Sequence, residues 1–167
     1  MAGTYYGDYL NLEQLLSSQN PLSKKNGNEC HDETLFIIVH QVYELWFKQI
    51  LHELVSIRDV FTSDNIEERS LHSVNERLER IIKIQKLLID QLPVMETMTP
   101  MDFLEFRDLL VPASGFQSIQ FRQIEVLMGL PTGKRGKVDR SYFMGRLNEK
   151  DQAVLNDVES QASLLSL

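Results

Sequence analysis

The stretch at residues 35–49, LFIIVHQVYELWFKQ, is almost entirely apolar or aromatic, yet it carries His40 near its middle. An imidazole titrates near neutral pH and can donate a hydrogen bond, accept one or ligate a metal. Phe36 lies four residues earlier, one helical turn away on the same face. His40 is therefore either an inert, hydrogen-bonded core histidine or the polar tip of an aromatic wall. Such a wall suits a flat, mostly apolar ligand with a single N–H or O–H group.

Arg107 is the second candidate, within the stretch DFLEFRDLL. Phe103 lies four residues before it and Leu110 three residues after it, so the arginine shares an apolar helical face. Arginine is rarely buried without an anion. Two interpretations stay open: an ion pair with a Glu or Asp of the chain, or a bidentate clamp on the carboxylate of a ligand.

Other side chains that could do chemistry form no strong motif. The histidines are His31, His40, His52 and His72. None belongs to a His-x3-His or Glu-x-x-His motif, so the di-iron pattern of helical bundles is missing, and a lone cysteine cannot build a zinc site. Cys30 beside His31 is a weak signal for a thiol nucleophile, because neighbours in sequence need not be neighbours in space.

A basic cluster lies in a glycine-containing stretch and consists of Lys134, Arg135, Lys137 and Arg140. Its GKRGK segment lacks the spacing of a phosphate-binding loop. A solvated loop is therefore preferred over a phosphate site.

Composition narrows the class of protein. The 167 residues suffice for one domain with a hydrophobic core, and a net charge of −7 argues against general nucleic-acid binding. Cys30 is the only cysteine, so no internal disulfide can form, which fits a reducing compartment. The first residues lack the apolar core of a signal peptide, and no apolar run approaches about 18 residues. We expect a cytoplasmic protein with no membrane span.

Apolar residues recur at steps of three or four, which predicts helices, and no segment alternates in the manner of a strand. We expect a short helix that begins at about Leu10 and ends near Asn20-Pro21, a polar loop at 21–31 and a long buried helix at 33–61, capped by Asp32. A further helix at 66–92 should turn one face inward. That face consists of Leu71, Val74, Leu78, Ile81, Ile82, Leu88 and Leu92.

The second half of the chain carries clear helix-start residues. Thr99 is expected to cap a helix at 100–110, and Ser114 a helix at 115–128. The expected helix breakers are Pro93, Val111-Pro112, Gly129 and Pro131.

After a loop at 129–141, a last helix should run from about Asn148 into the terminal leucines. The predicted fold class is all-α, a helical bundle in a single domain over residues 1–167. The final helix lacks an ending signal, which suggests a chain that has been cut and a bundle that is incomplete.

Three long motifs in series resemble the tryptophan 2,3-dioxygenase family: YYGDYLNLEQLL, HDETLFIIVHQVYELWFKQ and ETMTPMDFLEFRDLLVPASGFQSIQFR. The resemblance implies a haem enzyme of all-α fold, assembled as a tetramer. Such an enzyme inserts dioxygen across the indole C2–C3 bond of L-tryptophan. The product is N-formylkynurenine, and the reaction is the first step of tryptophan catabolism by the kynurenine pathway.

The resemblance also implies roles for particular residues. Phe36 would pack on the indole and His40 would meet its N–H, while Arg107 would bind the substrate carboxylate. Phe103, where some members carry Tyr, would line the pocket. The remaining implied site residues are Ile37, Ile38, Val39 and Leu110 beside the substrate, Ala113 and Ser114 beside the haem, and Tyr6, Tyr9 and Leu10, which would close a neighbouring subunit's pocket.

One departure concerns the iron. The family's proximal histidine lies well downstream, and this chain has no histidine after His72. No iron ligand is therefore assigned here, and the chain is expected to be the N-terminal portion of such an enzyme. A missing C-terminal segment or a second chain would supply the ligand. The alternative is a non-catalytic truncated member that acts as an oligomerisation or scaffold subunit.

Overall fold

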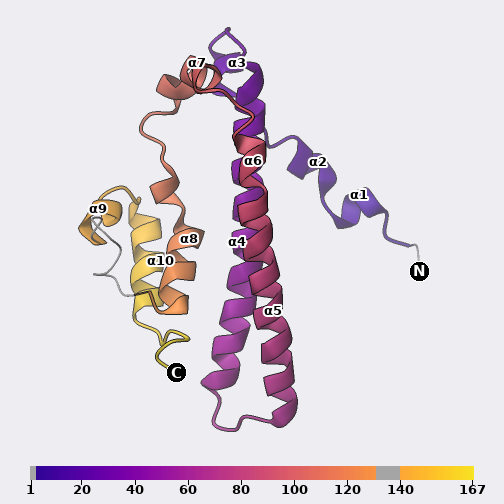
Figure 1. The fold of residues 1–167 in the computed structure, drawn as a ribbon, viewed down its shortest axis with the longest axis vertical. Helices are drawn as coiled ribbons and strands as arrows, with labels where there is room; N and C mark the ends of the chain where they lie inside the picture. The colour runs from indigo at the N-terminus through magenta and orange to yellow at the C-terminus, as the bar shows by residue number, and fades with distance from the viewer. Residues whose placement is uncertain (1–2, 131–139) are drawn as a thin grey trace. The chain divides into compact units, whose positions relative to one another are not determined.

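A computed structural model describes residues 3–130 and 140–167 of the chain (Figure 1). Within these residues every regular element is a helix, so the predicted all-α class is confirmed. None of these helices combines the length and apolar character that a membrane crossing needs. The chain divides into two compact units, Met1–Gln41 with Pro93–Val111 and Val42–Leu92 with Pro112–Leu167. The single domain expected from chain length stays a prediction.

The longest element is α4 (His31–Phe61), a helix of 31 residues that contributes to both units. Its sequence contains no proline or glycine, so nothing interrupts the main-chain hydrogen bonds. The predicted cap at Asp32 is wrong, because the helix begins at His31, two residues before the predicted start at Glu33. Asp32 and Glu33 instead lie in the first turn, where carboxylates meet the positive end of the helix dipole.

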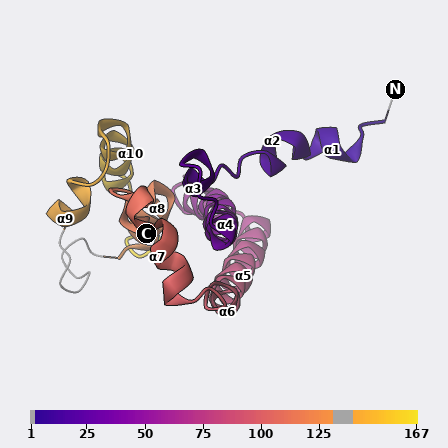
Figure 2. The same cartoon turned by 90° about the horizontal axis from the view of Figure 1, so that it is seen from above.

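In the second unit, α5 (Glu68–Asp90) lies beside α4, joined to it by a short connection (Figures 1 and 2). The hydroxyl of Tyr43 donates a hydrogen bond of 2.6 Å to the carbonyl oxygen of Leu88 and ties the two helices together. The core between them consists of Ile50, Leu54 and Ile57 from α4 and Val74, Ile81, Ile84 and Leu88 from α5.

The predicted inward face of α5 is only partly correct. Val74, Ile81 and Leu88 are buried as expected, and Ile84, which was not predicted, joins them. The residues predicted inward but found exposed are Leu71, Leu78, Ile82 and Leu92. Helix α5 has two neighbouring apolar stripes. The stripe with Val74, Ile81, Ile84 and Leu88 faces α4, and the stripe with Leu71, Leu78 and Ile82 does not. The helix also ends at Asp90, before Pro93, and a further turn, α6 (Leu92–Met95), follows it.

The second unit is completed by α8 (Ile119–Met128) and α10 (Glu149–Glu159), which pack against each other, and by the short α9 (Arg140–Met144). Ile124, Leu127 and Val158 extend the α4–α5 core. The main-chain N–H of Leu164 donates to the carbonyl oxygen of Leu127 at 2.7 Å and holds the last residues on α8.

Two predicted helices of this unit need correction. The helix expected at 115–128 is a 3-10 turn, η1 (Gly115–Gln117), followed by α8. Ser114 caps the turn and Ser118 caps α8. The last helix is capped by Asn148 as expected but ends at Glu159, before the terminal leucines.

Gly129 ends α8 with a φ of 90°, as predicted, because glycine adopts this left-handed conformation without strain. Pro131 and the basic residues Lys134, Arg135 and Lys137 lie outside the described residues, so the interpretation of that cluster stays a prediction. Arg140 is described, and its guanidinium pairs with Glu159 at 2.8 Å.

In the first unit, the helix expected from about Leu10 to near Asn20 is two shorter helices, α1 (Tyr6–Tyr9) and α2 (Leu12–Leu16), and the second ends before Asn20. Asn11 lies between them with a φ of 53°, a left-handed conformation that interrupts a helix. The loop expected at 21–31 contains a further short helix, α3 (Leu22–Lys25).

The helix predicted at 100–110 is confirmed as α7 (Pro100–Leu110). The Thr99 hydroxyl accepts from the N–H of Asp102, and the Asp102 carboxylate accepts from the N–H and hydroxyl of Thr99 at 2.9 and 2.6 Å. These bonds hold the pKa of the Asp102 carboxyl below its ordinary value.

A buried carboxylate fixes the start of α4 to α3. Glu33 is 1% exposed, and its two oxygens accept the main-chain N–H groups of Leu22 at 2.7 Å and Ser23 at 2.9 Å. The Ser23 hydroxyl in turn accepts the N–H of Cys30 at 2.9 Å. Burial by itself raises the pKa of Glu33, but the hydrogen bonds from Ser23 and Leu22 outweigh it and lower the pKa below 4.5.

Replacing this carboxylate should loosen α3. Glu33→Gln leaves one acceptor and places an amide N–H₂ against a main-chain donor, so we expect a loss of about 1–3 kcal/mol in the free energy of unfolding. Urea denaturation at pH 7 measures it. Glu29→Gln is the matched control, because Glu29 forms only an exposed ion pair with Lys24 at 3.3 Å and should change stability by less than about 0.5 kcal/mol. Equal effects of the two variants would contradict the role of Glu33.

The same contact predicts a pH dependence. The folded-state pKa of Glu33 lies below the ordinary 4.5, so its stabilisation is complete above pH 4.5 and is lost as the pH falls through the folded-state pKa. The stability difference between the wild type and Glu33→Gln should therefore shrink in acid. A constant difference down to pH 3 would contradict this assignment.

Candidate functional site

Three phenylalanines of the first unit form an aromatic cluster between α4 and α7. The ring of Phe36 on α4 stacks on Phe103 of α7 at 5.6 Å between centroids, with 25° between the planes. Phe106, also on α7, meets Phe36 and Phe103 at 5.6 and 5.5 Å with its edge toward their faces. Offset stacking and edge-to-face contacts are the arrangements that aromatic rings prefer, so the three rings form one packed aromatic wall.

Phe106 anchors this wall, since it is fully buried at 0% exposure. It packs in a small core with Cys30 and Met98, around which lie Leu35, Phe36, Met95, Phe103, Leu109 and Leu110. Phe106 was not identified from the sequence. The available signal was its spacing three residues after Phe103, which puts both rings on neighbouring parts of one helical face.

His40 is exposed, so it is not a core histidine as one interpretation held. Its ring lies 4.2 Å from the ring of Phe36, and its Nδ1 lies 2.7 Å from the main-chain carbonyl oxygen of the same residue. A carbonyl can only accept, so Nδ1 carries the proton. In the neutral ring Nε2 is then an acceptor. An acceptor of this kind can receive one N–H or O–H group.

Arg107 is also exposed, and its guanidinium carbon lies 5.9 Å from the centroid of the Phe103 ring. Of the two interpretations made from sequence, the ion pair is not found: among residues 3–130 and 140–167, no Glu or Asp pairs with Arg107. The guanidinium keeps its donors for an external anion. His40, Phe36, Phe103 and Arg107 thus form one continuous row of contacts.

The other residues assigned to the substrate lie on the same two helices. Ile37 is partly buried, Ile38 is 43% exposed and Val39 is 9% exposed. Leu110 packs against the aromatic core of the first unit. The geometry of these four residues does not test their assigned roles.

Five further site residues were predicted from the resemblance. Ala113 and Ser114 belong to the second unit and are exposed, and the Ser114 hydroxyl accepts the N–H of Phe116 at 3.3 Å. Tyr6, Tyr9 and Leu10 are 69%, 77% and 40% exposed at the N-terminal end of the first unit.

Metal-ligating side chains are dispersed in the part of the chain that the structure describes. There, no three residues of the types His, Cys, Asp and Glu gather into a group that could hold a metal ion. Cys30 is buried and its thiol points to the carbonyl oxygen of Asn28 at 3.5 Å, which makes it a packing residue and not an exposed nucleophile.

The row of contacts defines a type of ligand site. A flat aromatic wall, with a hydrogen-bond acceptor at one end and a guanidinium at the other, suits an aromatic amino acid with a ring N–H and a carboxylate. The family model described as tryptophan 2,3-dioxygenase matches residues 1–167, and this chain belongs to that family.

Individual relatives agree with this assignment. A protein named tryptophan 2,3-dioxygenase from Alteromonas mediterranea is 53% identical over 98% of this chain, and one from Dictyostelium discoideum is 50% identical over 99%. Tryptophan 2,3-dioxygenase A from Danio rerio is 46% identical over 99%. The chain spans 45%, 41% and 41% of these relatives, a little under half of their length.

The packing of the wall gives a direct test. Phe106→Ala removes a fully buried ring and should lower the free energy of unfolding by about 3–5 kcal/mol. Leu104→Ala is the control, because Leu104 lies on the same helix but is 54% exposed. The measurement is denaturant unfolding followed by circular dichroism. If both variants lost the same stability, Phe106 would not be the anchor of the cluster.

Proposed function

We propose that this chain forms the substrate-binding side of a haem-dependent tryptophan 2,3-dioxygenase, which oxidises L-tryptophan with dioxygen to N-formylkynurenine. The observation that carries the proposal is the row His40–Phe36–Phe103–Arg107, with ring contacts of 4.2 and 5.6 Å and a guanidinium 5.9 Å from the last ring. The acceptor at His40 suits the ring N–H of tryptophan, and the guanidinium of Arg107 suits its carboxylate. The names of the relatives support the same substrate.

In this proposal each residue has one task. The indole lies on the aromatic wall, and its N–H donates to Nε2 of His40, whose proton is held on Nδ1 by the carbonyl oxygen of Phe36 at 2.7 Å. The guanidinium of Arg107 binds the carboxylate through two parallel hydrogen bonds. Fixing both ends of the substrate orients the ring before reaction and removes rotational freedom that would otherwise slow the chemistry.

When bound, the haem would supply the activation of dioxygen. A histidine side chain normally holds such an iron, and the histidines of this chain do not fit that task. His31, His52 and His72 are exposed, and His72 lies 3.4 Å from Glu76. His40 belongs to the substrate row. We therefore assign no iron ligand within this chain and derive no step through the haem.

The proposal includes an oligomer, a tetramer built from copies of the chain or completed by a second chain. The exposed Tyr6, Tyr9 and Leu10 would cover the pocket of a neighbouring subunit. A non-catalytic scaffold subunit has no use for an acceptor and a guanidinium placed along one aromatic wall. The row of contacts therefore favours the enzyme over the scaffold.

Arg107→Leu should weaken tryptophan binding to the haem-loaded enzyme that contains this chain. Loss of the charged hydrogen bonds to the carboxylate costs about 2–5 kcal/mol, at least about thirtyfold in Kd. Tryptamine lacks the carboxylate, so its affinity should change less than threefold. Arg107→Lys keeps the charge without the planar fork, so its affinity for tryptophan should lie between those of the wild type and Arg107→Leu. A tryptophan affinity within threefold of the wild type would refute the clamp.

His40→Ala should lower kcat/KM for tryptophan by about fivefold or more, since one hydrogen bond to the indole is lost. Haem content, measured from the absorption spectrum, should stay close to that of the wild type. The analogue with sulfur in place of the indole N–H should bind both proteins equally, because it makes no bond to Nε2. Parallel loss of haem and activity would instead identify His40 as an iron ligand.

A further inference from the structure

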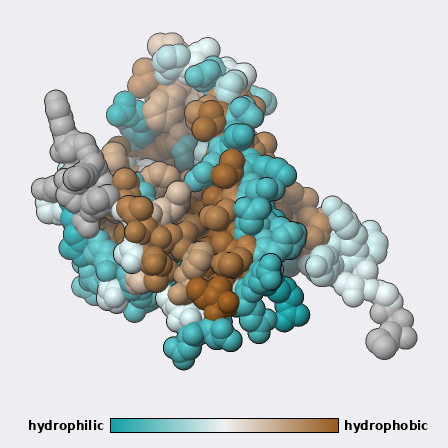
Figure 3. All heavy atoms as spheres, turned by 60° about the horizontal axis from the view of Figure 1, so that its bottom comes forward, coloured by the Kyte–Doolittle hydropathy of each residue, from teal (hydrophilic) through white to brown (hydrophobic). Residues whose placement is uncertain are grey.

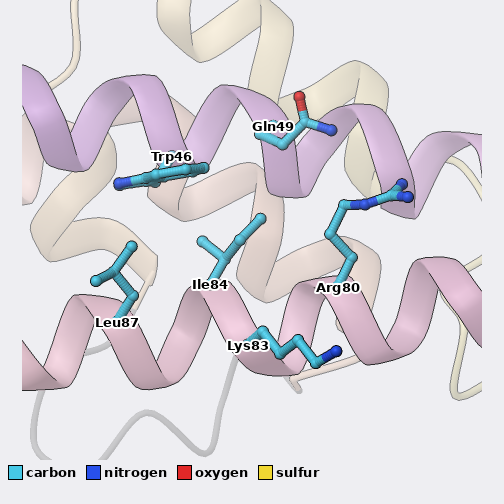
Figure 4. Close-up of a pocket in the computed structure, with 6 residues that line it drawn as sticks. All are labelled: Trp46, Gln49, Arg80, Lys83, Ile84 and Leu87. Carbon is cyan, nitrogen blue, oxygen red and sulfur yellow. The ribbon is translucent and has the colours of Figure 1, made fainter.

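A groove lies between α4 and α5 in the second unit, apart from the aromatic row. Its volume is about 420 Å³, which is within the range of small-molecule sites. Apolar side chains also lie open between hydrophilic ones on one face of the molecule (Figure 3), but in this groove two cations accompany them. The groove is lined by Trp46 and Gln49 from α4 and by Arg80, Lys83, Ile84 and Leu87 from α5 (Figure 4).

The groove has an apolar end and a polar end. Because α4 and α5 run in opposite directions, Trp46 lies at the same end as Leu87 (Figures 1 and 4). Gln49 lies at the other end with Arg80, and Ile84 lies between the two ends. The distance along α5 from position 80 to position 87 is about 10 Å. A ligand that fills the groove therefore has a flat or elongated apolar body with a polar group at one end.

The apolar end is formed around a partly exposed indole. Trp46 packs against the α4–α5 core with part of its surface and lines the groove with another part. Leu87 is 44% exposed beside it, while Ile84 is only 6% exposed and closes the groove toward the core. An indole face is flat and apolar, so an aromatic ring or a short methylene chain can pack on it.

The polar end is held in place by a buried carboxylate. Oε1 of Glu53, a residue that is 3% exposed, accepts from Nη1 of Arg80 and from the amide of Gln49, both at 2.6 Å. Glu53 therefore compensates the charge of Arg80 and fixes the direction of its side chain. The bond uses only one nitrogen of the guanidinium, and the Arg80 side chain is 54% exposed. Its other N–H groups can donate to a ligand.

Lys83 gives the groove its net positive charge. It is exposed and lies three residues after Arg80 on the same helix. Within residues 3–130 and 140–167, no carboxylate forms an ion pair with the Lys83 ammonium, and no Glu or Asp lines the groove. Since Glu53 compensates Arg80, the charge of Lys83 is the one that a bound anion would neutralise.

From these contacts we propose that the α4–α5 groove binds a small amphiphilic carboxylate, an acid with a flat or elongated apolar body. The body lies on Trp46 and Leu87, and the carboxylate meets Lys83 and the free N–H groups of Arg80. An amino acid is disfavoured, because its ammonium would lie beside Lys83. The proposal does not rest on the proposed function, since no residue of the aromatic row takes part.

The first test uses Trp46 as the reporter. It is the only tryptophan of the chain, so the tryptophan fluorescence of residues 1–167 reports directly on the groove. Titration with phenylbutyrate should change this fluorescence until the groove is saturated. Phenylbutanol is the matched probe, because it has the same apolar body without the carboxylate. It should bind at least about tenfold more weakly, since the charged hydrogen bonds are lost.

The second test reverses the charge of the groove. Lys83→Glu should raise the Kd for phenylbutyrate at least about tenfold, because attraction is replaced by repulsion. The same variant should bind phenylbutylamine, a cation of the same shape, more tightly than the wild type does. Such a gain cannot arise from misfolding.

Lys48→Glu is the matched control for this reversal. It makes the same change of charge on α4, but Lys48 lines a separate groove with Leu51 and His52. Its Kd for phenylbutyrate should stay within about twofold of the wild type, because salt screens exposed charges that are not in contact. Circular dichroism checks that both variants stay helical.

Each outcome bears on the proposal. A wild type whose fluorescence shows no saturable response to phenylbutyrate would overturn it. Equal affinities for phenylbutyrate and phenylbutanol would also overturn it, because they would indicate an apolar surface that does not select an anion, such as a protein partner covers. So would a Lys83→Glu variant that binds phenylbutyrate as tightly as Lys48→Glu does.

Discussion

The stacking of Phe36 on Phe103 is the interaction on which the candidate site depends. It joins α4 to α7 and sets the plane on which a ligand would lie. Each of its rings carries one polar group: His40 lies on the Phe36 side and Arg107 on the Phe103 side. Neither polar side chain is buried, so the packed part of the site is the pair of rings, supported by the fully buried Phe106. The relative position of the two polar groups therefore depends on hydrophobic packing within the first unit.

Much of the fold was predictable from local signals. The capping box at Thr99, the proline after it and the uninterrupted apolar pattern of α4 each act within a few residues, so one sequence suffices to find them. The features that were missed depend on contacts between distant residues. The fixation of α3 to α4 by Glu33 needs two segments about ten residues apart to meet, and periodicity does not contain this information.

The candidate site was also predictable only in part from the sequence. The types and spacing of Phe36, His40 and Arg107 were visible in the sequence, but their exposure was not. Helical periodicity places His40 on an apolar face, and only the packed structure shows that this face is open. Similarly, both stripes of α5 were predicted to be core from the sequence, because hydrophobicity alone does not say which stripe packs against α4. The family resemblance, in contrast, came from long motifs and was confirmed over the whole chain.

The hydrogen bond that fixes the His40 proton has a consequence for how the site can evolve. Its acceptor is the main-chain carbonyl oxygen of Phe36, four residues earlier on the same helix. No side-chain substitution can remove that oxygen, and any sequence that keeps α4 helical keeps it in place. The ring at position 36 can therefore vary to reshape the wall without altering which imidazole nitrogen carries the proton. Pocket shape and hydrogen-bond polarity are thus separable traits, controlled by a side chain and by the helix main chain, respectively.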